Sequence, residues 1–494
     1  MKRRLHLTWI AALGAAFLGA CAQMPTESAV GALQRAQTAM GAAQVNSLAF
    51  TASGTGTTFG QAYTPTAPWP KITYSNFSKH YDYANSAMSE EAARVRAEPT
   101  GGGAVPLMGT GEQKTSGRLN GEFAWNMTPN PSASPRDVDG RVHDLWTSPH
   151  GVLKAAASNA AQVSMATVDG QTQTALSFSV AGRFSAIAYV NAQGLVSRVD
   201  AVVPSPVLGD MPVVTWYDDY KDYGGVKFPS RIRQTAAGSA VLDVMVSDVK
   251  VNTPLVAAVP DGVRHFKENV VAEKAAETQG LGVWFLAGGS HNSVLIEMTD
   301  HAVLVETPLN DGRSLAVLAK ARELIPNKPL RYVINSHHHF DHAGGVRTAA
   351  SQGLTLVTSS AAKPYFEQAL ANPNRIRSDA LATANAAGQA KWSVEGVSGK
   401  RTMSDDKRTI EIYEIQGSVH AQGFMMVYLP AEKILIEADA FTPGAPNAPA
   451  PTKINDNHLN LASNIQTNSL QVERILPLHG RMVNVAEFNR AIGK

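Results

Sequence analysis

Cysteine is almost absent from the 494-residue sequence, which contains only Cys21. A single thiol excludes an intramolecular disulfide, even in an exported chain for which disulfides would be permitted. The fold therefore has to be stabilised by buried apolar surface, by chain size and by any metal that it binds. With 44% hydrophobic and 17% charged residues, the composition is that of a globular chain and excludes a wholly disordered one.

An excess of charge of one sign is also absent. The chain has 43 Lys and Arg residues against 41 Asp and Glu residues, and leaving out Lys2, Arg3 and Arg4 gives 40 against 41. No basic motif stands out. Because nucleic-acid binding relies on a concentrated positive surface, the sequence predicts no nucleic-acid partner.

The N-terminal segment has the layout of a secretory signal. A basic start is followed by an apolar stretch at residues 5–18, which is too short to span a membrane as a helix. The next residues, Leu-Gly-Ala-Cys at 18–21, resemble the lipobox of bacterial lipoproteins. This resemblance implies a signal peptide at residues 1–20 and a palmitate-type lipid anchor on Cys21 in the cell envelope of a bacterium. An ordinary secretory signal cut nearby stays open as the alternative.

The residue after Cys21 indicates in which membrane the lipid anchor would lie. Ala22 stands where an Asp would indicate retention in the inner membrane of many bacteria. We therefore expect anchoring in the outer membrane, facing the periplasm. Residues 21–44, rich in Ala, Gln, Ser and Gly, are interpreted as a tether.

The length of the chain predicts two or three folded units, with two as the starting expectation. Residues 45–264 contain many short β-type segments separated by Gly, Pro and Asn turns, which predicts a mostly β domain. The pattern resembles the curved sheets of periplasmic lipoprotein-handling proteins and implies a curved sheet or half-barrel. Such a sheet could be a scaffold for the second domain, could shape its cleft, or could bind a hydrophobic ligand.

Residues 265–494 show a different pattern, in which strands and helices alternate as in an α/β domain. Helices are expected at residues 312–324 and 361–371, and residues 372–389 are interpreted as an insertion. The expected strands lie at residues 283–286, 293–298, 302–306, 332–335, 354–358, 409–414, 425–429, 433–436 and 472–475.

Four potential metal ligands follow the expected strand at residues 332–335. They are His337, His339, Asp341 and His342. Alternate residues of an extended segment point to the same side, so the first two can face one metal while the others, on the following turn, face a second. Imidazoles with a carboxylate suit zinc, and iron or manganese can use the same donors. A purely structural role could explain any one of these residues, but it does not explain four of them within six positions.

The string Asn-Ser-His-His-His-Phe-Asp-His-Ala-Gly-Gly at residues 335–345 matches the HxHxDH signature of the metallo-β-lactamase superfamily. The resemblance extends over about residues 283–480 and implies an αββα sandwich at the C-terminus. It also implies three further ligands near strand ends, for which the candidates in chain order are His420, Asp439 and His479.

The resemblance implies a definite division of these ligands, carried over position by position. One metal is assigned to His337, His339 and His420, and the other to Asp341, His342 and His479, with Asp439 between the two. Two such metals, roughly 3.5–4 Å apart, lower the pKa of a bridging water toward about 7 and polarise a carbonyl or phosphoryl oxygen. Asp341 is the expected catalytic residue, which orients the water or accepts its proton.

Several nearby residues are given other roles. Glu306 stands where many relatives have Asp, which concerns the surroundings of the metals and not their ligands. His338 is expected to point away from the metals. His291 lies in a turn where relatives sometimes place substrate-contacting residues, and it is interpreted as a turn residue. The Pro-rich residues 442–452 form either a rigid loop over the cleft or a surface connection.

The leading hypothesis is an envelope-anchored dinuclear zinc hydrolase that acts on a small ester, thioester, lactone or amide. β-Lactamases of this superfamily tend to have Cys or another residue at the position of Asp439, which disfavours β-lactam hydrolysis without excluding it. A mononuclear iron dioxygenase of the persulfide-oxidising kind shares the motif and stays an alternative. A third possibility is an envelope binding protein in which the β-rich half binds a lipid or partner and the metal domain is secondary.

Overall fold

The computed structural model describes residues 28–97, 111–127, 129–268, 276–277, 281–446, 448–449 and 451–494. The expected signal peptide and the lipid-attachment residue Cys21 lie outside the described residues. Among the helices that the structure does describe, none is both long enough and apolar enough to cross a membrane.

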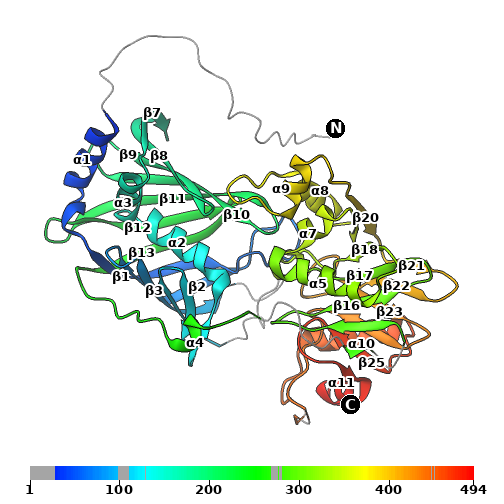
Figure 1. The fold of residues 1–494 in the computed structure, drawn as a ribbon. Coiled ribbons are helices and arrows are strands. Elements are labelled where there is room, and N and C mark those ends of the chain that lie inside the picture. The colour runs from blue at the N-terminus through cyan, green and yellow to red at the C-terminus, as the bar shows by residue number, and fades with distance from the viewer. Residues whose placement is uncertain are drawn as a thin grey trace, which may run out of the picture.

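The N-terminal half forms one antiparallel sheet of 13 strands, in the order β6-β5-β4-β3-β2-β1-β13-β12-β11-β10-β9-β8-β7 (Figure 1). The first and last strands pair at its centre, so the sheet is built outward in two series of hairpins. The strands are β1 (Ser47–Thr57), β2 (Lys71–Asp82), β3 (Ala87–Arg96), β4 (Gln113–Asn120), β5 (Phe123–Met127), β6 (Pro131–Ala133), β7 (Gln162–Val168), β8 (Gln171–Val180), β9 (Phe184–Val190), β10 (Val196–Ser205), β11 (Gly209–Asp222), β12 (Lys227–Ala236) and β13 (Ser239–Val251).

Helices cover one face of this sheet. In β9 every second residue is buried, from Phe184 to Val190, as expected for a strand with one face in the core. That core also contains Ala36, Leu145 and Leu153 from the covering helices. The helical segments are α1 (Ala29–Ala39), η1 (Ala42–Gln44), η2 (Pro135–Asp137), α2 (Val138–Thr147), α3 (Gly151–Ser158) and α4 (Asp261–Arg264). The predicted β-rich domain is confirmed, whereas α2 and α3 were not predicted. Residues 29–44, interpreted as part of a tether, instead form α1 and η1 and contribute to this core.

The C-terminal half contains two sheets that pack face to face. One has the order β14-β15-β16-β17-β18-β19-β20 and the other the order β21-β22-β23-β24-β25-β26. The strands are β14 (Ala276–Glu277), β15 (Val283–Leu286), β16 (Ser293–Glu297), β17 (Ala302–Val305), β18 (Leu330–Ile334), β19 (Thr355–Ser359), β20 (Ser393–Val397), β21 (Lys400–Ser404), β22 (Thr409–Glu414), β23 (Met425–Leu429), β24 (Ile434–Glu437), β25 (Arg474–Pro477) and β26 (Val483–Asn484).

Helices lie outside both of these sheets. All four residues of β17 are buried because Val303 and Val305 face the other sheet while Leu304 packs with the helices. The helices are α5 (Asp311–Leu324), α6 (Phe340–Ala343), α7 (Val346–Ser351), α8 (Lys363–Ala371), α9 (Ala380–Ala386), α10 (Asp456–Thr467) and α11 (Val485–Ala491). The predicted αββα sandwich is confirmed. The expected bounds of β15, β22 and β23 agree with the structure residue for residue.

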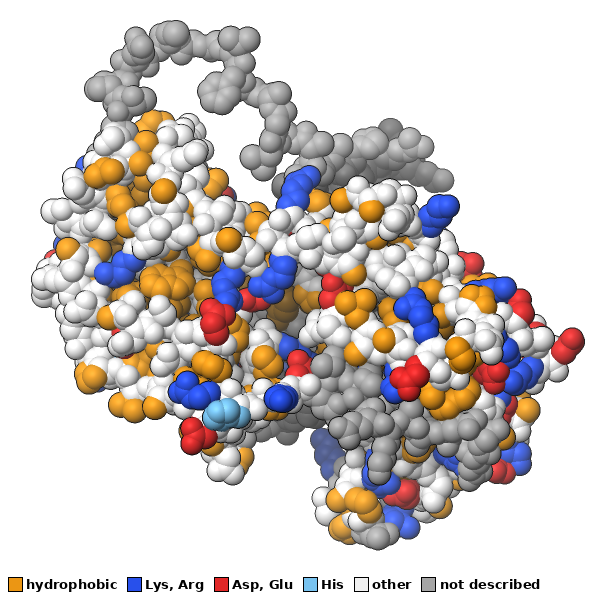
Figure 2. All heavy atoms as spheres, viewed as in Figure 1, with side chains coloured by type: hydrophobic (Ala, Val, Ile, Leu, Met, Phe, Trp, Pro, Cys, Tyr) orange, Lys and Arg blue, Asp and Glu red, His pale blue; other side chains and the backbone are white. Residues whose placement is uncertain are grey.

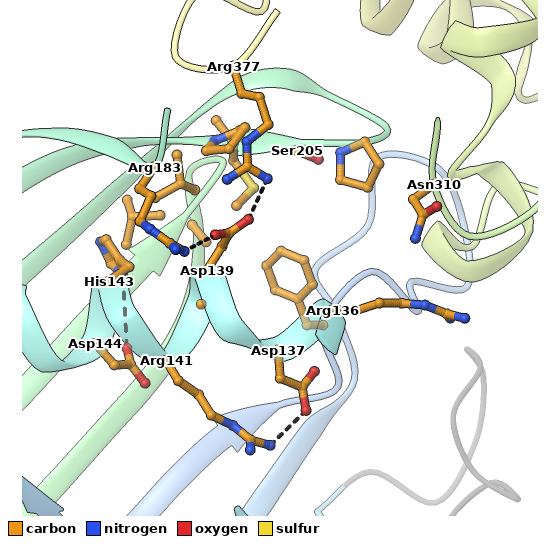
Figure 3. Close-up of a pocket in the computed structure, with 18 of the residues that line it drawn as sticks. Arg136, Asp137, Asp139, Arg141, His143, Asp144, Arg183, Ser205, Asn310 and Arg377 are labelled. Carbon is orange, nitrogen blue, oxygen red and sulfur yellow. Dashed lines mark hydrogen bonds and ion pairs between the residues drawn. The ribbon is translucent and has the colours of Figure 1, made fainter. Parts of the chain in front are cut away.

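The two domains border an open cavity of about 950 Å³ where they meet. Phe59 of the first domain and Leu309 of the second line it, whereas the predicted metal ligands do not. Figure 3 shows Arg183 and Arg377 both pointing toward Asp139 at this cavity, and each forms an ion pair with it. In Figure 2, Lys, Arg, Asp and Glu side chains surround the hollow between the domains. The ion pair between Asp139 and Arg377 therefore helps to join the two halves.

Candidate metal centre

The predicted ligands lie on loops at one edge of the C-terminal sandwich. β15, β17 and β18 run in the same direction, so the loops that follow them reach the same edge of their sheet. The segment from His337 to His342 follows β18 and continues into α6. In the other sheet, His420 precedes β23, Asp439 follows β24 and His479 follows β25. Residues far apart in the sequence therefore converge between the two sheets.

The first cluster consists of His337, His339, His420 and Asp439, with one potential ligand atom of each residue lying within 4.8 Å of the others. The Nε2 atom of His337 is 2.9 Å from Nδ1 of His339 and 3.1 Å from Nε2 of His420. The Oδ2 atom of Asp439 is 2.8 Å from Nε2 of His420. Three ring nitrogens and a carboxylate oxygen thus surround one point, as zinc ligands do.

The second cluster lies beside the first and contains Asp341, His342 and His479. The Nε2 atoms of the two histidines are 3.1 Å apart, and that of His342 is 3.8 Å from Oδ2 of Asp341. Asp439 reaches this cluster as well, because its Oδ1 lies 2.8 Å from Nε2 of His479 and its Oδ2 lies 3.2 Å from Nε2 of His342. The two oxygens of Asp439 therefore face both clusters, which suits a ligand shared by two metals.

His291 also belongs to the second cluster, although the sequence analysis interpreted it as a turn residue. Its Nε2 lies 3.2 Å from Oδ2 of Asp341, and only 5% of the residue is exposed. The neighbouring Asn292 donates its side-chain amide to the carbonyls of Pro477 and Gly480, at 3.1 and 2.9 Å. The β15–β16 turn is thus fixed to the loop that carries His479. One feature of the sequence could have indicated this role: the turn that contains His291 follows β15, which ends at the same edge of the sheet as β18.

Most ligand imidazoles are held through the ring nitrogen that does not face the cluster. Such partners fix the orientation of the ring and decide which nitrogen carries the proton. The pairs are Ser336 Oγ with His337 Nδ1 at 2.9 Å, Ala62 O with His339 Nε2 at 2.9 Å, Glu306 Oε2 with His342 Nδ1 at 2.8 Å, and Ser290 O with His479 Nδ1 at 3.0 Å. Nδ1 of His420 has no partner among the described residues.

Glu306 lies in the surroundings of the ligands, as expected from the sequence, and the structure shows which ligand it contacts. It is fully buried, and besides accepting from His342 it accepts a hydrogen bond from the hydroxyl of Ser336. Its backbone lies in the left-handed region with φ of +63°, which is unfavourable for a residue with a side chain. The surrounding fold maintains this backbone strain at the position that orients a ligand.

The electrostatics of the first cluster favour the protonation states that bind cations. Burial, together with the neighbouring His342, holds the pKa of His337 well below its ordinary value, and burial with His337 does the same for the pKa of His339. Burial opposes the ionisation of Asp439, but His342 and His420 outweigh it and hold the pKa of that carboxyl well below its usual range. Neutral imidazoles beside an ionised carboxylate form a donor set that fits zinc or a similar divalent metal. In the second cluster burial opposes protonation, but Glu306 and Asp439 raise the pKa of His342 well above its ordinary value, and Asp439 raises that of His479. A metal bound there would have to displace protons from these rings.

The centre is more open on the side of the second cluster. The side chains of Asp341 and His479 are 33% and 20% exposed, whereas that of His337 is fully buried. The Pro-rich segment begins beside this opening, where Pro443 packs near Gly480. A substrate would therefore approach from the side of Asp341 and His479.

All seven predicted ligands lie in these two clusters. His338 lies outside them, and its Nε2 faces the carbonyl of Ala62 at 2.8 Å. Ala62 belongs to the N-terminal domain, for which the sequence left open a role as a scaffold or in shaping the cleft but indicated no contact with a ligand.

Comparisons with known proteins concern the C-terminal half. Residues 286–463 match the model of the metallo-beta-lactamase superfamily. Among solved structures, a metallo-beta-lactamase from Pontibacter korlensis is 16% identical, and the alignment covers 44% of this chain and 97% of that one with a TM-score of 0.34. FIM-1 from Pseudomonas aeruginosa, described in a mono-zinc form, is 19% identical over 44% of this chain and 92% of that one, with a TM-score of 0.33. No curated protein matches the sequence.

Proposed function

Because the chain contains a metallo-β-lactamase superfamily domain with two clusters of metal-binding residues, we propose that it is a dinuclear zinc hydrolase for a small ester, thioester, lactone or amide. The observation that carries the proposal is the position of Asp439 between the clusters, with Oδ2 near His420 and His342 and Oδ1 near His479. Two cations held there would supply a water of lowered pKa and an electrophile for the substrate's carbonyl oxygen.

The protein's own residues prepare the site for that chemistry. The Oδ2 atom of Asp341 faces the second cluster beside His291, where it can orient the attacking water and accept its proton. The buried histidines of the first cluster exclude water from the inner side, so a substrate carbonyl is confined to the open side near His479. Asp341 is accordingly the proposed catalytic carboxylate.

The test begins with metal analysis of protein purified without added metal. We expect about two zinc ions per chain, loss of both zinc binding and hydrolysis in a His339→Ala variant, and no change in a His265→Ala variant, whose histidine is exposed. Hydrolysis is measured in parallel on esters, thioesters, lactones and β-lactams. One tightly bound iron with oxygen consumption, or the absence of bound metal, would overturn the proposal.

We propose in addition that the enzyme is anchored in the bacterial outer membrane through a lipid on Cys21. The support is the sequence at residues 18–21, which resembles a lipobox. Mass spectrometry of the mature N-terminus is expected to show a diacylated cysteine, and a Cys21→Ser variant is expected to lose the lipid and leave the membrane fraction. An unmodified N-terminus after a cut elsewhere contradicts this proposal without affecting the metal centre.

A further inference from the structure

The loop between β1 and β2, residues 58–70, crosses from the N-terminal domain to the metal centre. Its backbone follows the ligand segment, since the amide of Phe340 donates to the carbonyl of Gly60 at 3.2 Å. The side-chain amide of Gln61 donates to Oδ1 of Asp341 at 2.9 Å. The next carbonyl, that of Ala62, accepts from Nε2 of His339. Three consecutive loop residues therefore contact three consecutive residues of the ligand motif.

The same loop also contacts the segment that carries His420. The carbonyl of Tyr63 accepts from the amide of Gln422 at 2.7 Å, and its hydroxyl donates to the carbonyl of Ser418 at 3.0 Å. The loop thus joins two ligand-bearing segments that come from different sheets. Removing it would leave buried polar groups on both segments without partners.

Aromatic packing fixes the base of the loop. The ring centroids of Phe59 and Trp69 are 4.3 Å apart, and those of Phe59 and Phe340 are 5.3 Å apart at an interplanar angle of 89°. Gly60 has a φ of +72°, and a Cβ atom there would lie 2.5 Å from Cγ of Phe340. Only glycine allows the loop to come this close to the motif.

A second contact fixes the two domains relative to one another. Asp210, near the start of β11, donates its amide to the carbonyl of Pro373 at 2.7 Å and accepts from the amides of Arg375 and Ile376 at 2.9 and 3.1 Å. These partners belong to the segment that the sequence analysis interpreted as an insertion. The domain that carries the loop at residues 58–70 is therefore fixed in place, and this holds the loop against the ligand segment.

The chemistry of the contacts determines what they do to the ligands. A carbonyl oxygen only accepts, so the Nε2 atom of His339 that faces Ala62 carries the proton, and the lone pair of the ring lies on Nδ1. It is Nδ1 that faces the first cluster. Likewise Gln61 occupies Oδ1 of Asp341 and leaves Oδ2 for the second cluster.

We propose that the β1–β2 loop is part of the metal centre, with the carbonyl of Ala62 positioning His339 for the first metal and Gln61 positioning Asp341 for the second. The N-terminal domain is then required for full metal binding and is not a separable tether or binding module. The proposal rests on the proposed function in that it assumes two bound metals. Partners of this kind typically change metal affinity by about 10–100-fold when removed.

The experiment is a competition titration of the full-length protein with Zn²⁺ and a chromophoric chelator, which resolves the two affinities. Gln61→Ala is expected to weaken the second zinc by about 10–100-fold and to leave the first unchanged. Gly60→Ala displaces the loop and is expected to weaken both. The control is Gln171→Ala, an exposed glutamine at the start of β8, with thermal unfolding of the metal-free proteins as a check on folding.

The outcomes separate this inference from the proposed function. Wild-type affinities for both zinc ions in Gln61→Ala and Gly60→Ala would show that the loop only covers the centre, and the inference would be wrong. A wild-type protein that binds no zinc refutes the proposed function instead. If the wild-type protein binds one zinc, weakening of that zinc by Gly60→Ala still supports the role of Ala62, and an unchanged affinity refutes it.

Discussion

Replacing Glu306 by Gln tests how the fold orients a metal ligand from outside the cluster. The carboxylate of Glu306 accepts from Nδ1 of His342 at 2.8 Å in a fully buried environment. Hydrogen bonds to a charged group contribute about 1.5–3 kcal/mol, whereas a neutral amide acceptor contributes about 0.5–1.5 kcal/mol. The substitution leaves the shape of the side chain and the backbone nearly unchanged. The weaker hydrogen bond should therefore affect mainly the orientation and basicity of the His342 imidazole.

We expect a loss of about 1–2 kcal/mol in binding of the second metal, which corresponds to a decrease in affinity of about 5–30-fold. The first zinc should bind nearly as in the wild type, because the amide oxygen of glutamine can still accept from Ser336, the partner of His337, and Ala62 still holds His339. The assay is a zinc competition titration, with hydrolysis measured at saturating zinc. Glu323→Gln is the matched control, since Glu323 is exposed on α5 and pairs with Lys320 at the surface.

The refuting result is equally specific. If Glu306→Gln binds both zinc ions with wild-type affinity, the carboxylate does not orient His342. If instead both affinities fall together and the protein unfolds at a lower temperature, Glu306 is needed for folding of the sandwich rather than for one ligand. Only a selective loss of the second zinc agrees with the geometry.

Three further predictions concern other parts of the molecule. His291→Ala should weaken binding of the second zinc by about tenfold and leave the first unchanged, because the ring of His291 lies against the second cluster. A zinc titration that gives wild-type affinity for the second zinc would contradict this. Gly209→Ala should lower the unfolding temperature more than Gly121→Ala does. Both glycines have positive φ, but of these two only at Gly209 would a Cβ meet a neighbour, the carbonyl oxygen of Pro373 at 2.3 Å. Equal decreases in unfolding temperature by calorimetry would mean that this docking contact contributes nothing. Burial lowers the pKa of His150 to about 4, so the unfolded chain binds more protons between about pH 6.5 and 4, and up to about 3 kcal/mol of stability should be lost as the pH falls through that window. Urea unfolding at pH 7 and 4.5 measures this, and a His150→Gln variant should depend less on pH; an unchanged pH dependence would exclude His150 as the cause.

The sequence by itself determined the elements whose signal is local. The C-terminal strands β15 and β23 are short runs of mostly buried apolar residues between turns, and β22 has apolar residues among polar ones, so their limits are visible in the amino-acid order. The motif at His337 to His342 is equally local, because residues this close in the chain must share one site. His420, Asp439 and His479 could be found because each stands next to a strand whose end has a fixed place in the sandwich.

Only the tertiary structure decided which residues surround those ligands. Glu306 and His291 reach the centre because the loops after β17 and β15 end at the same edge as β18, which depends on strand order and not on residue type. Gln61 and Ala62 come from another domain, and no periodicity links them to ligands that lie 280 and 277 residues further along the chain. The ligands can thus be identified from local sequence spacing, whereas their orientation depends on long-range contacts that exist only once both domains have folded.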